Sequence, residues 1–155
     1  MNFRTLLLFP VLLALCATSA KSQTEGFALG AQLFSPTGIT AKATLSKNAA
    51  ITGLIGFNIN EFNNTISLQT NLILNGNKDS FNIESGFLRS YYGIGVNFIF
   101  QENSDAGIGF RVPLGIQYEL QDQPLEIYMD IAPTINIEPN SAFFLSSSMG
   151  FRYFL

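Results

Sequence analysis

Residues 26–155 alternate between apolar and polar side chains with a period of two, and the pattern recurs along the whole segment. A period of two is typical of β-strands, whose successive side chains point to opposite faces of a sheet. No window of this segment carries apolar residues at the i, i+3, i+4, i+7 spacing of an amphipathic helix over three turns. The alternation therefore predicts an all-β fold.

Turn-forming residues divide the alternating segment into eight predicted strands. Clusters of Gly, Pro, Asn, Asp and Ser mark most of the breaks, because these residues favour turns. The predicted strands are residues 26–34, 39–45, 50–59, 65–74, 88–100, 106–120, 125–137 and 143–155. Residues 80–87 follow neither pattern clearly and could extend either neighbouring strand. No linker or change of composition indicates a second domain.

The charged residues inside the predicted strands all fall on the polar face. These seven residues are Lys42, Arg89, Arg111, Glu119, Glu126, Asp130 and Arg152. Two architectures produce such an alternation. A soluble barrel or sandwich buries the apolar face, whereas a transmembrane barrel turns it toward lipid and keeps the polar face inside.

Two features favour the transmembrane barrel. The apolar faces consist almost entirely of Ile, Leu, Val and Phe, over runs that reach the ~9–11 residues a tilted strand needs to cross a bilayer. The polar faces are rich in Gly, Ser and Asn, and only 12% of the chain is charged. We therefore predict an eight-stranded antiparallel up-and-down transmembrane β-barrel, in which the seven strand charges form an interior polar network. A soluble exported lipocalin-like barrel that binds a ligand is the alternative.

Residues 1–22 have the three-part layout of a secretory signal peptide. Arg4 supplies a basic start, residues 6–17 form an apolar run, and small residues follow up to Ser22. The apolar run is too short to span a bilayer. Cleavage after Ser22 would leave residues 23–155 as an outer-membrane β-barrel domain without cysteine, and hence without disulfides. Cleavage after Ala20 is the alternative.

The last eight residues resemble the terminal strand signal of bacterial outer-membrane barrels. That signal is a polar residue, a glycine two positions later, an aromatic residue three positions after the glycine, and a hydrophobic residue at the end. Ser148, Gly150, Tyr153 and Leu155 occupy these positions, with Leu155 where phenylalanine is usual. The resemblance implies that the barrel assembly machinery recognises the C-terminal strand.

Five short motifs are spread along the mature chain, at residues 45–48 (LSKN), 91–95 (YYGIG), 109–115 (GFRVPLG), 130–133 (DIAP) and 150–153 (GFRY). With them the chain resembles a family of small eight-stranded bacterial outer-membrane β-barrels of unknown function, with the architecture of OmpX and of the OmpA membrane domain. The resemblance implies eight antiparallel strands, both termini in the periplasm and location in the outer membrane of a Gram-negative cell envelope. It transfers no catalytic residue.

The composition excludes several classes of function. The chain has no histidine, so Ser-His and Cys-His triads and two-His metal sites are excluded. Eight basic residues against 11 acidic ones leave no basic excess for nucleic acid. The interior of an eight-stranded barrel is filled by side chains. We therefore expect no catalysis, no cofactor, no metal and no solute channel, but a structural or interaction role in contact with outer-membrane lipid. Binding of a small amphiphile is the alternative.

Two carboxylates are predicted to face each other across the turn at residues 121–124. Counting outward from this turn places Glu119 opposite Glu126. As an isolated pair they could hold a proton or a cation. We favour the interpretation that both belong to an ion network with Arg152.

Two prolines are predicted to interrupt the sheet, because proline has no N–H for a strand ladder. The same counting places Val112 opposite Pro133 and Pro113 opposite Ala132. We therefore predict a bulge or a break in hydrogen bonding here, which would turn Arg111 or Asp130 inward.

Overall fold

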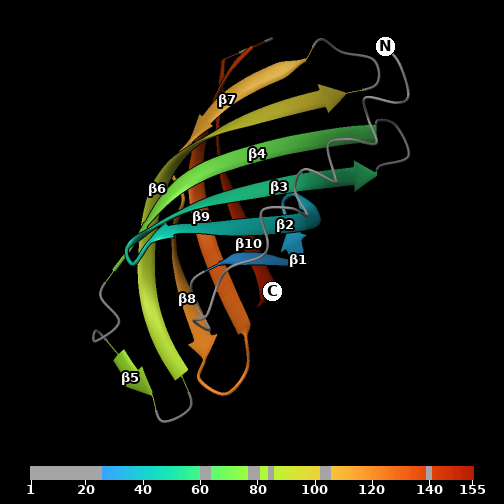
Figure 1. Ribbon diagram of the computed structural model, residues 1–155. Helices are drawn as coiled ribbons and strands as arrows, with labels where there is room; N and C mark the ends of the chain where they lie inside the picture. The colour runs from blue at the N-terminus through green and yellow to red at the C-terminus, as the bar shows by residue number, and fades with distance from the viewer. Residues whose placement is uncertain (1–25, 60–63, 77–80, 84–85, 102–105, 139–140) are drawn as a thin grey trace.

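The computed structural model describes residues 26–59, 64–76, 81–83, 86–101, 106–138 and 141–155 (Figure 1). The predicted signal peptide and residues 23–25 lie outside the described residues. Within the described ranges no helix is long and apolar enough to cross a membrane. The strands are β1 (Phe27–Phe34), β2 (Thr37–Ser46), β3 (Ala49–Ile59), β4 (Asn64–Asn75), β5 (Phe81–Ile83), β6 (Gly86–Gln101), β7 (Gly107–Arg111), β8 (Leu114–Leu120), β9 (Leu125–Glu138) and β10 (Ala142–Phe154).

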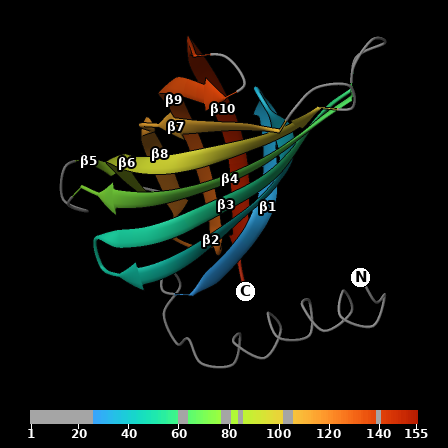
Figure 2. The same cartoon turned by 90° about the horizontal axis from the view of Figure 1, so that it is seen from above.

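The strands form one antiparallel sheet that closes into a ring. Strands that follow one another in the sequence pair with one another, except β4 with β5 and β7 with β8. β10 pairs with both β9 and β1. The view from above shows β1 between β2 and β10, where the ring closes (Figure 2). Closure pairs the two edges that an open sheet would leave free. The all-β, antiparallel up-and-down arrangement predicted from the alternation is confirmed.

The strand count differs from the prediction, with ten strands in the described residues instead of eight. The predicted strand at residues 106–120 is divided into β7 and β8, which both lie between β6 and β9. In addition, β5 pairs with the first residues of β6, beyond the part of β6 that pairs with β4. A three-residue strand is too short to show a period of two, which is why the pattern at residues 80–87 was ambiguous.

The division between β7 and β8 occurs at the predicted proline pair. The Val112 N–H donates to the Pro133 carbonyl at 3.0 Å, and the Gly93 N–H donates to the Pro113 carbonyl at 2.9 Å. Neither proline nitrogen carries a hydrogen to return these bonds. The predicted break in hydrogen bonding is therefore present. One hydrogen bond is missing toward β9 and one toward β6, at neighbouring residues of the line formed by β7 and β8.

The predicted consequence of this break is wrong. Arg111 lies opposite Thr134 and Leu114 lies opposite Ile131, so the register is the same before and after the break and there is no bulge between them. A register shift occurs instead between Ile108 and Gly109. Arg111 points inward because the period of two continues through the break, and it does not need to be turned by the prolines.

Apolar side chains cover the outside of the ring and polar side chains fill its inside. On β10 the alternate residues Phe151 and Tyr153 are each 52% exposed, whereas Arg152 between them is 4% exposed. The same alternation runs along β6 and β9. This distribution is the reverse of that in a soluble protein, where charged side chains are almost never fully buried.

Candidate functional site: an interior polar network

The inside of the ring holds all seven charged residues that the sequence places on the polar face. Six of them are at most 4% exposed, and the Asp130 side chain is 10% exposed. Its members come from β2 and from each of the strands β6, β7, β8, β9 and β10. The seven residues are Lys42 (β2), Arg89 (β6), Arg111 (β7), Glu119 (β8), Glu126 and Asp130 (β9) and Arg152 (β10).

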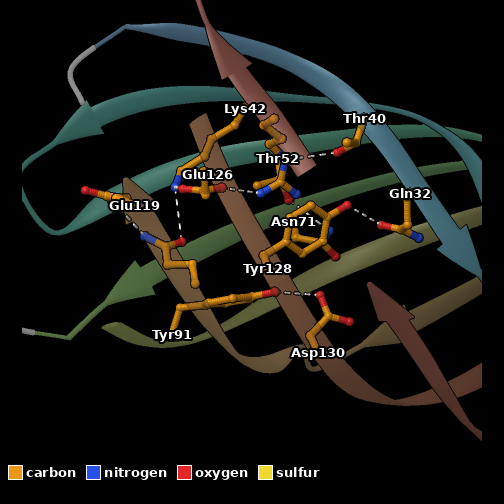
Figure 3. A network of polar contacts seen from close by, with 12 residues as sticks. Gln32, Thr40, Lys42, Thr52, Asn71, Tyr91, Glu119, Glu126, Tyr128 and Asp130 are labelled. Atoms are coloured by element: carbon orange, nitrogen blue, oxygen red, sulfur yellow. Dashed lines mark hydrogen bonds and ion pairs between the residues drawn. The ribbon is translucent and has the colours of Figure 1, made fainter. Parts of the chain in front are cut away.

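Glu126 lies at the centre of the first cluster and is fully buried. One carboxylate oxygen, Oε2, lies 2.5 Å from Lys42 Nζ, and the other, Oε1, accepts a hydrogen bond from Arg152 Nη1 at 2.8 Å (Figure 3). Arg152 lies directly opposite Glu126 on the neighbouring strand. Its guanidinium also donates to Thr40 Oγ1 at 3.2 Å and stacks 3.7 Å from the ring centroid of Tyr128. Both carboxylate oxygens are therefore occupied by cations.

Glu119 belongs to a second ion pair, and an amide connects it to the first cluster. Arg89 Nη2 donates to Glu119 Oε2 at 2.7 Å. Gln117 accepts from Lys42 Nζ at 3.1 Å through its oxygen and donates to Glu119 Oε1 at 3.3 Å through its nitrogen. Glu119 lies opposite Glu126 in the register, as predicted, but each carboxylate has its own cation. The geometry is that of an ion network and not of an isolated carboxylate pair.

Asp130 organises a third cluster farther along β9. It accepts hydrogen bonds from Tyr91 Oη and from Ser148 Oγ, each at 2.7 Å. The Arg111 guanidinium lies 3.8 Å from the Asp130 carboxylate and also donates to the amide oxygen of Gln69. Two hydroxyl groups and one cation therefore surround this carboxylate.

A glycine opposite Arg111 keeps this part of the interior open enough for its neighbours. Gly95 on β6 pairs with Arg111 on β7. A Cβ at residue 95 would lie 2.2 Å from Asn71 Oδ1 and 2.5 Å from the backbone oxygen of Thr70. Only glycine fits here without displacing the backbone of β4.

Little space is left among these side chains. A cavity of about 10 Å³, lined by residues that include Gln69, Asn71, Tyr91, Arg111 and Asp130, lies within the ring. This volume corresponds to about one water molecule. The described interior can thus neutralise charge and brace the strands, but this cavity is too small for a solute or an acyl chain.

The sequence interpretation missed the uncharged members of the network. Gln117 and Gln69 accept from cations, Tyr91 donates to Asp130, and Tyr128 donates to Gln32 Oε1 at 2.8 Å. A signal for them was available, because each lies on the same face of its strand as the charges. Restricting the candidate set to charged residues left them out.

The four residues of the predicted terminal strand signal divide between the two faces of β10. Ser148 and Gly150 point inward and are buried, and Ser148 donates to Asp130. Tyr153 and Leu155 point outward and are 52% and 67% exposed. The signal therefore combines two positions that complete the interior with two that lie on the outer surface.

Comparison with known proteins places this fold among barrels. It is similar to the crystal structure of the N-terminal β-barrel domain of Pseudomonas aeruginosa OprF, with a TM-score of 0.57 and 10% sequence identity, over 82% of this chain and 93% of that chain. No curated protein matches the sequence significantly. A family model described as "Protein of unknown function (DUF3996)" matches residues 18–154, which is most of the chain. The chain therefore belongs to the DUF3996 family.

Proposed function

We propose that this protein is an integral β-barrel of the bacterial outer membrane with a side-chain-filled interior and a structural or interaction role, without catalysis, cofactor or solute channel. On this proposal residues 1–22 are a cleaved signal peptide. β4 with β5, and β7 with β8, each count as one interrupted strand, so the barrel has eight strand positions.

The observation that carries the proposal is the position of the apolar side chains. Exposed large hydrophobic residues occur on β1, β2, β3, β4, β6, β7, β8, β9 and β10, which is every strand whose side chains are described. Their exposed fractions range from 36% to 70%. Monomeric soluble proteins rarely expose contiguous apolar patches of more than a few hundred Å². A lipid bilayer would cover such a surface, and a closed ring satisfies the backbone hydrogen bonds that lipid cannot.

The interior network supports the expectation that the barrel conducts no solute. The Lys42–Glu126 pair joins β2 to β9 across the inside of the ring. The Arg89–Glu119 and Arg152–Glu126 pairs join neighbouring strands, β6 with β8 and β10 with β9. A buried charge that loses its partner is strongly destabilising. Opening a passage would require several of these pairs to separate together. A role that uses the outer wall or the loops requires no such rearrangement.

The proposed partners follow from the outer surface and the terminal strand. Outer-membrane lipid would contact the apolar wall. The barrel assembly machinery would recognise β10 through the signal at Ser148, Gly150, Tyr153 and Leu155. The exposed Tyr153 and Leu155 side chains support this, because they are accessible on the outside of the strand.

Cell fractionation combined with a heat-shift gel tests the proposal. We expect the mature protein in the outer-membrane fraction, and we expect it to migrate differently before and after boiling, because a folded barrel resists detergent without heat. Recovery in the soluble periplasmic fraction with identical migration in both samples would contradict it and favour the exported soluble barrel. A variant truncated before β10 is the matched control and should show no heat shift.

A further inference from the structure

The first and last strands of the ring do not pair over their full lengths. β1 pairs with β10 only as far as Phe34, which lies opposite Ser148. β10 begins six residues earlier, and residues 142–147 pair with β9 on their other side. In Figure 1, β9 and β10 continue well past the end of β1. The Ser35 N–H still donates to the Ser147 carbonyl at 3.3 Å. Residues 142–146 therefore form an open edge in an otherwise closed sheet.

The turn between β1 and β2 explains why β1 does not continue along this edge. The side chain of Gln32 donates to the Pro36 carbonyl at 3.0 Å, and Thr37 Oγ1 donates to the Phe34 carbonyl at 3.0 Å. A Cβ on Gly56 would lie 2.7 Å from the Pro36 ring, so the turn lies against β3. Phe34 itself has a φ of 75°, which ends the extended conformation of β1. The chain thus turns away from β10.

The direction of the hydrogen bonds identifies the peptide groups at the open edge. The Leu155 N–H donates to Phe27 on β1, whereas the Phe154 N–H donates toward the β9 side, to Pro124. Neighbouring residues of a strand alternate in direction, so the odd-numbered residues of β10 face the β1 side. The peptide groups of Phe143 and Leu145 therefore point to the open edge. In the described part of the chain no strand pairs with them.

The side chains beside this edge are apolar and exposed. Phe143 and Leu145, on the outer face, are 70% and 61% exposed, and Phe144, on the other face, is 36% exposed. Residues 141–151 contain no charged residue and no proline. Free strand edges in natural proteins are usually protected by Lys, Pro or a bulge, and β10 has none of these here.

The chemistry of the edge selects its partner. Alternating N–H and C=O groups in a row are matched by the backbone of another extended chain. An acyl chain offers no such groups, and the 10 Å³ cavity inside the ring cannot take one. An antiparallel pairing with the same edge of a second copy requires a two-fold axis perpendicular to the barrel wall. That axis would turn one copy upside down in the same membrane.

We propose that residues 142–146 accept a short extended segment of a partner protein, which adds to the sheet as a strand in the place that β1 leaves free. The segment is uncharged and carries apolar side chains at alternate positions, to match Phe143 and Leu145. Because β1 occupies the rest of this line, the segment enters from the end of the ring that carries the β9–β10 loop. The open edge itself follows from the strand pairing, and the inference rests on the membrane proposal only where that proposal excludes a second copy.

A binding titration with a model strand tests the proposal. The probe is a fluorescein-labelled, acetylated and amidated hexapeptide of alternating Thr and Val, titrated with the folded mature protein in detergent micelles and followed by fluorescence anisotropy. We expect saturable binding, and binding at least about fivefold weaker for Leu145→Pro, which removes one donor from the edge. Leu145→Val is the matched control, because it keeps the N–H and should bind like the wild type. The same hexapeptide with N-methyl groups at alternate residues should bind the wild-type protein as weakly as the unmethylated hexapeptide binds the Leu145→Pro variant.

Amide hydrogen exchange of the wild-type protein provides a second measurement that needs no variant to fold. The amides of Phe143 and Leu145 should exchange quickly in the free protein and slowly with the hexapeptide, whereas those of Phe144 and Ser146 should be slow in both. Fast exchange that the peptide does not change would overturn the proposal, as would equal binding of the N-methylated peptide. Displacement of the peptide by lauric acid, with equal lauric acid binding to Leu145→Pro, would assign the edge to an amphiphile. Dimerisation that the peptide reverses would assign it to a second copy.

Discussion

Glu119 and Glu126 lie directly opposite each other on β8 and β9, yet each carboxylate is held by a different cation. Like charges that face each other across two strands destabilise a sheet. Arg89 neutralises one of them, while Lys42 and Arg152 together neutralise the other. The pair is tolerated because the ring brings cations from β2, β6 and β10 to the same place.

Removing the charge of Glu126 should destabilise the folded barrel strongly. Glu126→Gln leaves Lys42 and Arg152 buried without a carboxylate, and breaking a buried pair in this way costs about 3–5 kcal/mol. Asp122→Asn, in the exposed turn at residues 121–124, is the matched control and should change stability by less than about 0.5 kcal/mol. Urea unfolding in lipid vesicles measures both. Adding Lys42→Met to Glu126→Gln should restore part of the loss, and equal midpoints for the two single variants would refute the network.

A charge on the outer wall should be costly only where lipid contacts the wall. Val112 is 45% exposed beside the junction of β7 and β8, near the middle of their line. If it faces the bilayer midplane, Val112→Arg should lower the free energy of unfolding by about 2–4 kcal/mol. Gln121→Arg, in the exposed turn, should have little effect. Equal tolerance of the two substitutions in vesicles would contradict the assignment of this face to lipid.

An inward glycine, Gly95 on β6, and an outward glycine, Gly53 on β3, should respond differently to an added methyl group. Gly95→Ala would bring a Cβ to 2.5 Å from the Thr70 backbone oxygen, and overpacking of this kind costs about 1–3 kcal/mol. At Gly53 the nearest atom to a new Cβ is 3.9 Å away, so Gly53→Ala should be neutral or stabilising by up to about 1 kcal/mol. Unfolding midpoints compare the two. A loss at residue 53 as large as that at residue 95 would contradict the close packing described around Gly95.

Proline substitutions should distinguish the two edges of the first half of β10, one paired with β9 and the other open. The Ser146 peptide group faces Ala132 on β9, so Ser146→Pro removes a ladder hydrogen bond, together with the one that Ser146 Oγ donates to the Ala132 carbonyl at 3.0 Å. The expected loss is about 1–3 kcal/mol. Leu145→Pro should cost less, because its N–H points to the open edge. The temperature at which each variant loses its folded-form migration on a gel measures both losses of stability. A larger loss for Leu145→Pro than for Ser146→Pro would contradict the hydrogen-bond directions assigned to β10.

The filled interior predicts the electrical behaviour of the barrel. Wild-type protein in a planar bilayer should show only background conductance, because the Lys42–Glu126 pair crosses the ring and the cavity among the described interior side chains is only about 10 Å³. Single-channel recording at several voltages is the measurement. A stable and reproducible open state would show that the network separates readily, and would restore a solute channel as a possible function.

The local pattern was sufficient to predict which way side chains point and which residues face each other across short turns. A period of two fixes the face of every residue in a strand, so the sequence alone predicts that the seven charges lie inside the ring. Counting outward from one turn also placed Glu119 opposite Glu126 and Val112 opposite Pro133, because a short turn fixes the register of its hairpin.

Contacts across the ring could not be predicted in this way. Lys42 and Glu126 are 84 residues apart, and Gln32 and Tyr128 are 96 residues apart. Their meeting depends on how far the strands are staggered when the sheet closes, which no single hairpin determines. The end of β1 at Phe34 agrees with the predicted strand at residues 26–34. Which residues of β10 this end leaves without a partner depends on the same stagger, and the pattern does not determine it. The turn at Pro36, which ends β1 there, is held by contacts with Gln32 and with β3.

The pairing of β1 with β10 places the first strand of the chain beside the last one. A ribosome makes β10 after all the other strands of the ring, so every intermediate without β10 retains two unpaired edges and cannot complete the ring. Contacts between residues so distant in the sequence also make folding slow, because the entropy of closing a long loop must be overcome first. The growing chain therefore requires protection until β10 is present, and the loss of even this one strand would prevent closure of the whole wall.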